Sequence, residues 1–270
     1  TRSFAWKDNL TLFTTDAKTS RNSAKVQVSA AEVLIKEAEK TNNPVKKEKL
    51  LLEALQYLKR GGEIYPEYYG VYDLGGKAQF YLKNYDLSLE NYLICAKLNP
   101  KIPTPYNNIY AVGVNAFNDS VYDVAHRAFS FLTNKYPDST KYLFQLALVY
   151  KSTYKIDSAI IILNKIIKKD SCNADAYNQL GEIYARFLGN NRKAEEYLLK
   201  AVQCDPTHSS ALENLGVFYG MQGRSKDALN YFKKAHKYNP NSKNLIQNIG
   251  LAYKNLGMMD SAQYYLQKAM

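Results

Sequence analysis

Residues 209–242 read SSALENLGVFYGMQGRSKDALNYFKKAHKYNPNS and decide the fold. The first half carries apolar or small residues at the i, i+3, i+4 and i+7 spacing of a helix: Leu212, Leu215, Gly216 and Tyr219. After Gln222-Gly223, a second run with helical spacing follows: Ala228, Phe232 and Ala235. The second run ends at Pro240, because proline disfavours helical conformation in the residue before it and cannot continue the hydrogen-bond ladder. The stretch therefore predicts a helix, a turn and a second helix.

Small residues in this stretch predict where the two helices approach closely. Gly216 and Ala228 leave room between the backbones, and Tyr219 and Phe232 fill the space around them. This order of a large residue, Leu-Gly, Tyr, Ala, an aromatic residue, Ala and Pro resembles the tetratricopeptide repeat (TPR) family. The resemblance implies an all-α, right-handed solenoid whose first helices line a concave groove.

The same order recurs along the chain with a period of 34 or 35 residues. Ile246, Ile249-Gly250 and Tyr253 lie 34 positions after their counterparts in the quoted stretch. We predict an N-terminal capping helix or linker over residues 1–23 and a TPR solenoid over residues 24–270. Its seven predicted repeats are 24–68, 69–102, 106–139, 140–173, 174–208, 209–242 and 243–270.

The first repeat is longer than the others. Ala31 and Ala54 are 23 positions apart, whereas the equivalent Gly216 and Ala228 are 12 apart, so eleven residues are extra. The excess is centred on residues 40–44, which predicts that both helices lengthen into a hairpin projecting around residues 40–49.

Composition limits the functional classes. No run approaches about 18 apolar residues, so no transmembrane helix is expected. The chain opens at Thr1 without an apolar signal segment, which predicts that its targeting information lies elsewhere. The net charge is +11, with lysines concentrated in the predicted second helices. A solvated lysine-rich face explains this, and attraction to an anionic membrane or nucleic acid is the alternative. The acidic residues expected on the inner surface speak against nucleic acid: Asp175, Glu182 and Glu213.

No catalytic, metal or cofactor motif is present. Cys95, Cys172 and Cys204 fall in separate predicted repeats, which predicts neither a disulfide framework nor a metal site. Cys95 occupies a position where other repeats use alanine, so it is expected to be a buried small residue. We therefore expect no enzymatic activity within this chain.

The opening segment carries a second, narrower resemblance. Residues 4–26, FAWKDNLTLFTTDAKTSRNSAKV, resemble the segment that leads into the repeats of transmembrane-and-TPR glycosyltransferase-like proteins, a group similar to protein O-mannosyltransferases. The resemblance implies membrane proximity, an extracytoplasmic (in a bacterium, periplasmic) location, and chemistry with a lipid-linked sugar in a membrane part outside this chain. The alternative is an ordinary capping helix with Trp6 buried on the first repeat.

The expected function is a protein–protein interaction scaffold that binds extended polypeptide in its groove. A free-standing cytoplasmic TPR adaptor or assembly factor is the alternative. TPR adaptors that hold the C-terminal carboxylate of heat-shock proteins begin their clamp with a lysine. The equivalent positions are not basic here: Asp73, Tyr110, Phe144, Asn178, Glu213 and Gln247. That clamp is therefore not expected.

The groove is predicted to be apolar in the early repeats and polar in the later ones. The early inward positions are aromatic: Phe80, Tyr81, Tyr110, Phe117 and Phe144. The later ones are polar: Asn178, Glu182, Glu213 and Gln247. Aromatic residues at helical spacing also suit a core, which is the alternative for the first group.

A row of amides is the most specific candidate binding site. Gln145, Gln179, Asn214 and Asn248 are separated by 34, 35 and 34 residues, so a solenoid stacks them in line. An amide offers an acceptor and a donor, and can pair with the backbone of an extended peptide without reading its side chains. The row resembles the asparagine row on the TPR superhelix of O-GlcNAc transferases, which implies that it holds polypeptide substrate. Solvated amides without a ligand are the alternative.

Overall fold

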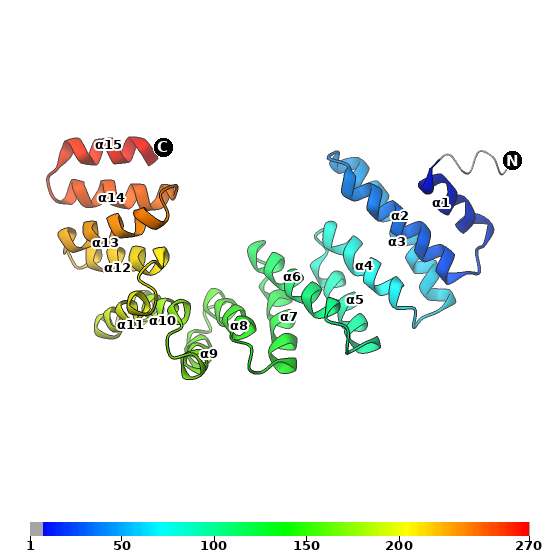
Figure 1. Ribbon diagram of the computed structural model, residues 1–270, viewed down its shortest axis with the longest axis horizontal. Coiled ribbons are helices and arrows are strands. Elements are labelled where there is room, and N and C mark those ends of the chain that lie inside the picture. Colours follow the sequence, from blue (N-terminus) through cyan, green and yellow to red (C-terminus); the bar gives the residue numbers. More distant parts are fainter. Residues whose placement is uncertain (1–7, 270) are drawn as a thin grey trace. The chain divides into compact units, whose positions relative to one another are not determined.

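The computed structural model describes residues 8–269, which form fifteen α-helices and no strands (Figure 1). Helix α1, Asn9–Thr19, precedes seven helix pairs. The first helices of the pairs are α2 (Ala24–Lys40), α4 (Tyr69–Tyr81), α6 (Thr104–Asn118), α8 (Thr140–Ser152), α10 (Ala174–Arg186), α12 (Ser209–Met221) and α14 (Lys243–Asn255). The second helices are α3 (Pro44–Ile64), α5 (Tyr85–Leu98), α7 (Tyr122–Lys135), α9 (Ile156–Lys169), α11 (Asn191–Cys204), α13 (Ser225–Tyr238) and α15 (Met259–Ala269). The all-α repeat arrangement is confirmed.

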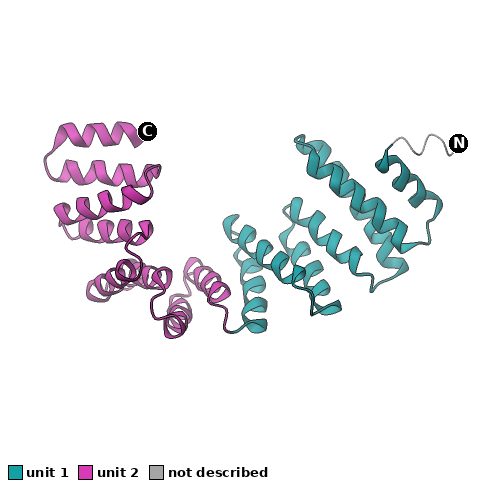
Figure 2. Cartoon of the chain, viewed as in Figure 1, with its two compact units in different colours: residues 1–137 teal, residues 138–270 magenta. Residues whose placement is uncertain are grey.

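The chain divides into two compact units, residues 1–137 and 138–270 (Figure 2). Unit 1 contains α1 to α7, and unit 2 contains α8 to α15. Within each unit, the two helices of a pair pack against each other and each pair packs against the next. First helices of neighbouring pairs also touch, as α10 and α12 do. Side chains on successive first helices can therefore form a continuous surface within a unit.

Glycine permits the close approach of helices within a pair. A Cβ atom added to Gly113 would lie 2.8 Å from Cε1 of Phe129, and one added to Gly216 would clash with the ring of Phe232. Both partner rings are buried. The predicted roles of Gly216 and Phe232 are confirmed, because the ring occupies the space that a larger residue would need.

The turn between the helices of most pairs contains one residue with positive φ, spaced by about one repeat. Three of these residues are glycines: Gly189, Gly223 and Gly257, with φ of 61°, 75° and 75°. The other three are Lys83, Ser120 and Tyr154, with φ of 60°, 64° and 58°. A left-handed residue commonly follows the C-terminus of a helix, where its backbone N–H satisfies a free carbonyl. In the last three pairs, glycine meets this requirement without strain.

The first pair is lengthened as predicted. Helix α2 has 17 residues and α3 has 21, whereas α4 to α15 have 11 to 15. Asn43 caps α3 by accepting a hydrogen bond from the Lys46 N–H at 3.1 Å, and Pro44 suits the first turn, where no intrahelical donor is needed. The extra residues therefore extend both helices and do not form a linker.

Helix α1 caps the first pair. Ala17 is buried against α2, and Gln27 donates a hydrogen bond from Nε2 to the Ala17 carbonyl at 2.8 Å. Phe4 and Trp6, on which part of the capping prediction rested, lie outside the described residues. Within residues 8–269, no helix is both long enough and apolar enough to cross a membrane.

Candidate functional site

Unit 2 places the predicted amide row on four first helices, α8, α10, α12 and α14. Gln145, Gln179, Asn214 and Asn248 are all half-buried. Asn214 donates from Nδ2 to Oδ1 of Asn178 at 2.8 Å, and Asn248 donates from Nδ2 to Oε1 of Glu213 at 3.1 Å. Each bond joins the first helices of two neighbouring repeats.

The spacing of these bonds explains their direction. The bonded residues are 36 and 35 positions apart, one more than the 35 and 34 that separate successive amides in the row. Each amide therefore reaches the residue just before its counterpart in the preceding repeat. Asn178 and Glu213, which the sequence placed on the inner surface as separate polar positions, are the acceptors.

Gln179 is held differently, because the residue before its counterpart is Phe144, which has no acceptor. Lys151 on α8 donates from Nζ to Oε1 of Gln179 at 2.5 Å and to Oε2 of Glu182 at 2.9 Å. The Lys151 and Glu182 side chains are only 18% and 17% exposed. Sequence reasoning did not select Lys151, which lies six residues after Gln145 in α8 and falls outside the equal spacing of the amides.

These bonds hold the amides in place but do not use all of their hydrogen-bond donors and acceptors. A primary amide has two N–H donors and a carbonyl oxygen with two lone pairs. Asn214 uses one donor on Asn178, and no other side-chain hydrogen bond of Asn214 occurs within residues 8–269. One donor and the carbonyl oxygen therefore remain for a ligand, with the side chain already ordered, which lowers the entropic cost of binding.

An apolar hollow of about 250 Å³ adjoins the C-terminal end of the row. Asn248 contributes to its lining, with apolar residues of α12 and α14: Val217, Met221, Leu251 and Ala252. Met221 is 72% exposed and Leu251 is 43% exposed. The hollow therefore offers an apolar contact beside a hydrogen-bonding amide.

Two acidic residues of the first helices, Glu213 and Asp175, have shifted pKa values. Burial raises the pKa of the Glu213 carboxyl, and the hydrogen bond from Asn248 opposes that rise in pKa. Asp175 accepts from Nε2 of His208 at 3.0 Å, which lowers the pKa of Asp175 and raises that of His208. His208 also caps α12, because its Nδ1 accepts a hydrogen bond from the Ala211 N–H at 3.1 Å. The second helices of unit 2 carry exposed lysines: Lys165, Lys168, Lys233, Lys234 and Lys237.

The aromatic candidates of α6 in unit 1 pack against their own repeat. The Tyr110 ring meets the Phe129 ring edge to face at 6.0 Å, and the Phe117 ring meets the Tyr122 ring at 5.6 Å. Both Tyr110 and Phe117 are half-buried. Each ring contacts the second helix of the same pair and also keeps an exposed part.

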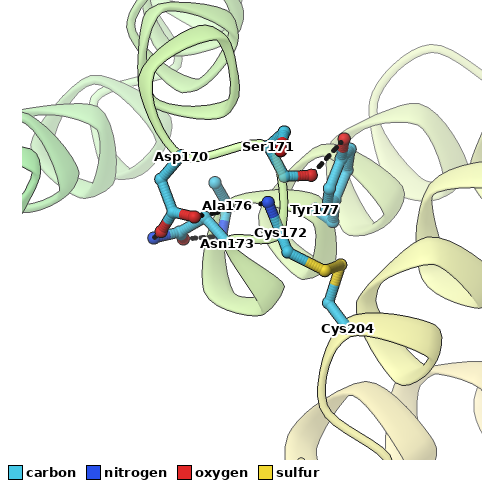
Figure 3. The surroundings of a disulfide bond; sticks show 7 residues. All are labelled: Asp170, Ser171, Cys172, Asn173, Ala176, Tyr177 and Cys204. Atoms are coloured by element: carbon cyan, nitrogen blue, oxygen red, sulfur yellow. Dashed lines mark hydrogen bonds between the residues drawn. A yellow bond between two sulfur atoms is a disulfide. The ribbon is translucent and has the colours of Figure 1, made fainter.

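The cysteine prediction is wrong. Cys172 and Cys204 form a disulfide, with Cα atoms 5.1 Å apart, while Cys95 is free and fully buried as predicted. Cys172 lies in the loop before α10 and Cys204 is the last residue of α11 (Figure 3). The two ends of one helical hairpin lie side by side, so two cysteines 32 residues apart can meet although neither is near the other in sequence. A separation of 32 residues, close to the length of one repeat, indicates such a pairing, and a search for cysteine motifs does not detect it.

The loop that carries Cys172 is ordered by its own hydrogen bonds. The Cys172 N–H donates to Oδ1 of Asp170 at 3.3 Å, and Asn173 caps α10 by accepting from the Ala176 N–H at 2.9 Å. The Tyr177 hydroxyl donates to the Ser171 carbonyl at 3.2 Å (Figure 3). The disulfide thus fastens an already folded loop to the end of the hairpin. Among residues 8–269, no three His, Cys, Asp or Glu side chains gather as a metal-binding group.

Two family models, both described as tetratricopeptide repeat, match the C-terminal part of the chain, one over residues 172–241 and one over residues 244–270. No curated protein matches the chain.

Solved structures resemble the chain over larger parts of its length. A thermophilic TPR protein of Thermus thermophilus is 20% identical, with a TM-score of 0.54, over 61% of this chain and 89% of that one. A chain of the APC/C hetero-tetramer Cut9–Hcn1 is 22% identical, with a TM-score of 0.57, over 92% of this chain and 46% of that one. A MamA protein is 26% identical, with a TM-score of 0.48, over 61% of this chain and 89% of that one. The fold is that of TPR solenoid proteins.

Proposed function

We propose that this chain, which has a TPR fold, is a protein–protein interaction scaffold whose unit 2 binds extended polypeptide along the first-helix face. The observation that carries the proposal is the pair of inter-repeat bonds, Asn214 to Asn178 and Asn248 to Glu213. They hold successive amides in one orientation and leave donors and acceptors for a ligand.

The geometry suits an extended backbone. Packed helices lie about 8–10 Å apart, and an extended chain advances about 3.3 Å per residue, so it meets one amide about every third residue. Between amides, the ligand's side chains point away from the row or, beside Asn248, toward the hollow with Met221 and Leu251. Such contacts give affinity with little sequence preference.

Each amide contributes modestly. A hydrogen bond of this kind adds roughly 0.5–1.5 kcal/mol net, so useful affinity requires several bonds made together. Three amides amount to about 1.5–4.5 kcal/mol, or at least about tenfold in Kd.

Binding of reduced and carbamidomethylated ribonuclease A, which cannot refold, tests the proposal by fluorescence anisotropy. The triple variant Gln179→Ala, Asn214→Ala and Asn248→Ala should bind it at least about tenfold more weakly than the parent chain. A matched control replaces Asn164, Gln203 and Asn230, which are exposed on second helices, and should bind like the parent. Equal binding by a folded amide variant and the parent would refute the role of the row.

We further propose an extracytoplasmic location. The disulfide between Cys172 and Cys204 supports it, because structural disulfides persist in oxidising compartments and are rare in the cytosol. Acid quenching of cells, alkylation of cysteines under denaturing conditions and mass spectrometry of the natural protein test this. Only Cys95 should be found as a thiol. Finding all three cysteines reduced would favour the alternative, a free-standing cytoplasmic adaptor or assembly factor.

Attachment to a membrane glycosyltransferase-like protein is the most specific setting that we propose. It rests on the resemblance of residues 4–26, which lie outside the two family matches. In this setting the amide row presents extended acceptor segments to an enzyme on the same polypeptide. The sequence upstream of Thr1 in the natural gene tests it, because several apolar spans are expected there. A reading frame that starts at this position would remove the membrane setting and leave polypeptide binding untouched.

A further inference from the structure

Unit 1 contains a hollow of about 350 Å³ on its first-helix face. Residues of α4 and α6 form its walls, and Tyr92 of α5 contributes from the second helix between them. From α4 come Asp73, Lys77, Phe80 and Tyr81, and from α6 come Thr104, Asn108 and Ala111. These positions recur every three or four residues on each helix, so one face of α4 and one face of α6 point into the same space.

Asp73 is the unusual group of this hollow. Its carboxylate is half-buried and has no hydrogen bond or ion pair within residues 8–269. Burial raises the pKa of the Asp73 carboxyl, and Lys77 one turn away opposes that rise. Partial burial of a charge without a partner is unfavourable, so we expect Asp73 to lower the stability of the fold.

The neighbouring cation, Lys77, is already engaged. It forms an ion pair with Glu39 of α2 at 2.8 Å, and Tyr81 donates a hydrogen bond to the same carboxylate at 2.5 Å. The other titratable groups that act on or around Asp73 are Tyr69, Tyr92 and Cys95. Burial, with the charge of Asp73 adding to it, raises the pKa of Tyr69 and of Cys95 to about 12 and that of Tyr92 further, so all three are neutral near pH 7.

Aromatic rings line the same hollow, and one of them already faces a cation, because Lys47 Nζ lies 4.7 Å from the centre of the Tyr81 ring. Tyr92 is 5% exposed and packs on Gly76, where an added Cβ would lie 2.8 Å from its ring. The Phe80 ring meets the Tyr81 ring edge to face at 6.1 Å. Aromatic faces attract ammonium and guanidinium groups, and a partly desolvated carboxylate strengthens that attraction.

We propose that the Asp73 hollow binds the cationic side chain of a lysine or arginine in a bound polypeptide. This deepens the proposed function and rests on it, because the hollow lies on the first helices, the kind of surface that carries the amides in unit 2. The charge complements such a ligand, because its cation would meet the Asp73 carboxylate. The hollow is open at the surface and fits one long side chain whose backbone stays outside.

Single-residue probes test this independently of the amide row. Nα-acetyl-lysine methylamide should shift the backbone amide resonances of Gly75 and Gly76 in the full chain, and Nα-acetyl-norleucine methylamide, which has no charge, should not. Asp73→Asn should weaken binding of the lysine probe at least about tenfold, the loss of one charge-assisted contact. Asp123→Asn, at an exposed aspartate of α7, removes the same charge from unit 1 and should bind like the parent.

The thermal stability of Asp73→Asn distinguishes the binding proposal from a purely structural role, in which the substitution would lower the melting temperature. Because partial burial of the unpaired carboxylate is unfavourable, Asp73→Asn should raise the melting temperature while it weakens binding of the lysine probe. A lower melting temperature, equal shifts with the norleucine probe, or equal weakening in Asp123→Asn would each overturn the proposal. Putrescine binding as tight as that of the lysine probe and of a lysine-containing peptide would also overturn it, since the ligand would then be a free diamine. If the lysine probe does not bind the Asp73 hollow but unit 2 still binds unfolded ribonuclease A, this proposal is refuted and the proposed function is not.

Discussion

Asn214 on α12 donates a hydrogen bond from Nδ2 to Oδ1 of Asn178 on α10 at 2.8 Å, and so links two repeats through their side chains. Asn178 is only 3% exposed, so its oxygen has little access to water. The same relationship recurs one repeat later between Asn248 and Glu213. The residues proposed to bind ligand therefore also stabilise the stacking of repeats.

Asn214→Ala should lower the free energy of unfolding by about 1–3 kcal/mol, because it removes the bond and leaves the buried Asn178 oxygen unsatisfied. Urea denaturation measures the loss. Asn230→Ala, at an exposed position of α13, is the control and should have little effect or stabilise slightly, since alanine favours a helix. Equal stability of Asn214→Ala and the parent would show that the inter-repeat bond adds nothing.

Reduction of the disulfide should destabilise unit 2. Closing a loop of 32 residues is worth roughly 3–4 kcal/mol in the chain-entropy account, and Cys172→Ser should lose most of it. Thermal unfolding with and without dithiothreitol measures the difference. The reductant should leave the melting temperature of Cys172→Ser unchanged, and a parent protein indifferent to dithiothreitol would contradict the pairing.

The left-handed turn residues predict opposite effects of two exchanges. Ser120→Gly should stabilise unit 1 by about 0.5–1 kcal/mol, since its φ of 64° strains any side chain. Gly223→Ala, where φ is 75°, should destabilise unit 2 by about 1–2 kcal/mol although no atom lies within 4 Å of an added Cβ. Chemical denaturation of the two variants checks this, and changes of the same sign would contradict the conformational explanation.

The Asp175–His208 pair should make stability depend on pH. The raised pKa of His208 stabilises the fold fully below its ordinary value of 6.5, and this is lost as pH rises through the folded value. The lowered pKa of Asp175 stabilises the fold above its ordinary value of 3.8, and this is lost as pH falls through the folded value. The difference in unfolding free energy between the parent and His208→Asn, which keeps a capping side chain, should therefore be largest between these two values.

Protonation of His208 has a cost that limits this gain. In the neutral ring Nδ1 accepts the cap hydrogen bond from Ala211, and in the charged ring both nitrogens carry protons. Urea titrations near pH 5 and pH 8 measure the net effect. A difference between parent and variant that does not change between these pH values would show that the ion pair contributes nothing.

The fold was predictable because its information is local. The helical spacing of Leu212, Leu215 and Tyr219, and the stop at Pro240, are readable within one repeat, and the period carries them along the chain. The lengthened α2 and α3 followed from the distance between Ala31 and Ala54. None of these inferences required knowledge of how one helix is rotated against another.

The chemistry between repeats was not predictable in the same way. Stacking of the amides followed from equal spacing, but the bond from Asn214 to Asn178 depends on an offset of one residue that helix rotation decides. The disulfide depends on the two ends of a hairpin lying together, which a search for cysteine motifs does not consider. In the sequence, Asp73 was notable only because it replaces the lysine of the heat-shock-protein clamp. Its lack of a hydrogen-bond or ion-pair partner could be recognised only from the positions of the surrounding side chains.

The most direct test of the central claim uses the ligand and leaves the protein unchanged. Two short synthetic peptides of identical side chains should be compared by calorimetry, one with a normal backbone and one with methyl groups on alternate backbone nitrogens. If the amides of unit 2 hold a polypeptide by its backbone, methylation removes donors and weakens binding at least about tenfold. Equal affinity for the two peptides would contradict the account, because the backbone would then not be what the row binds.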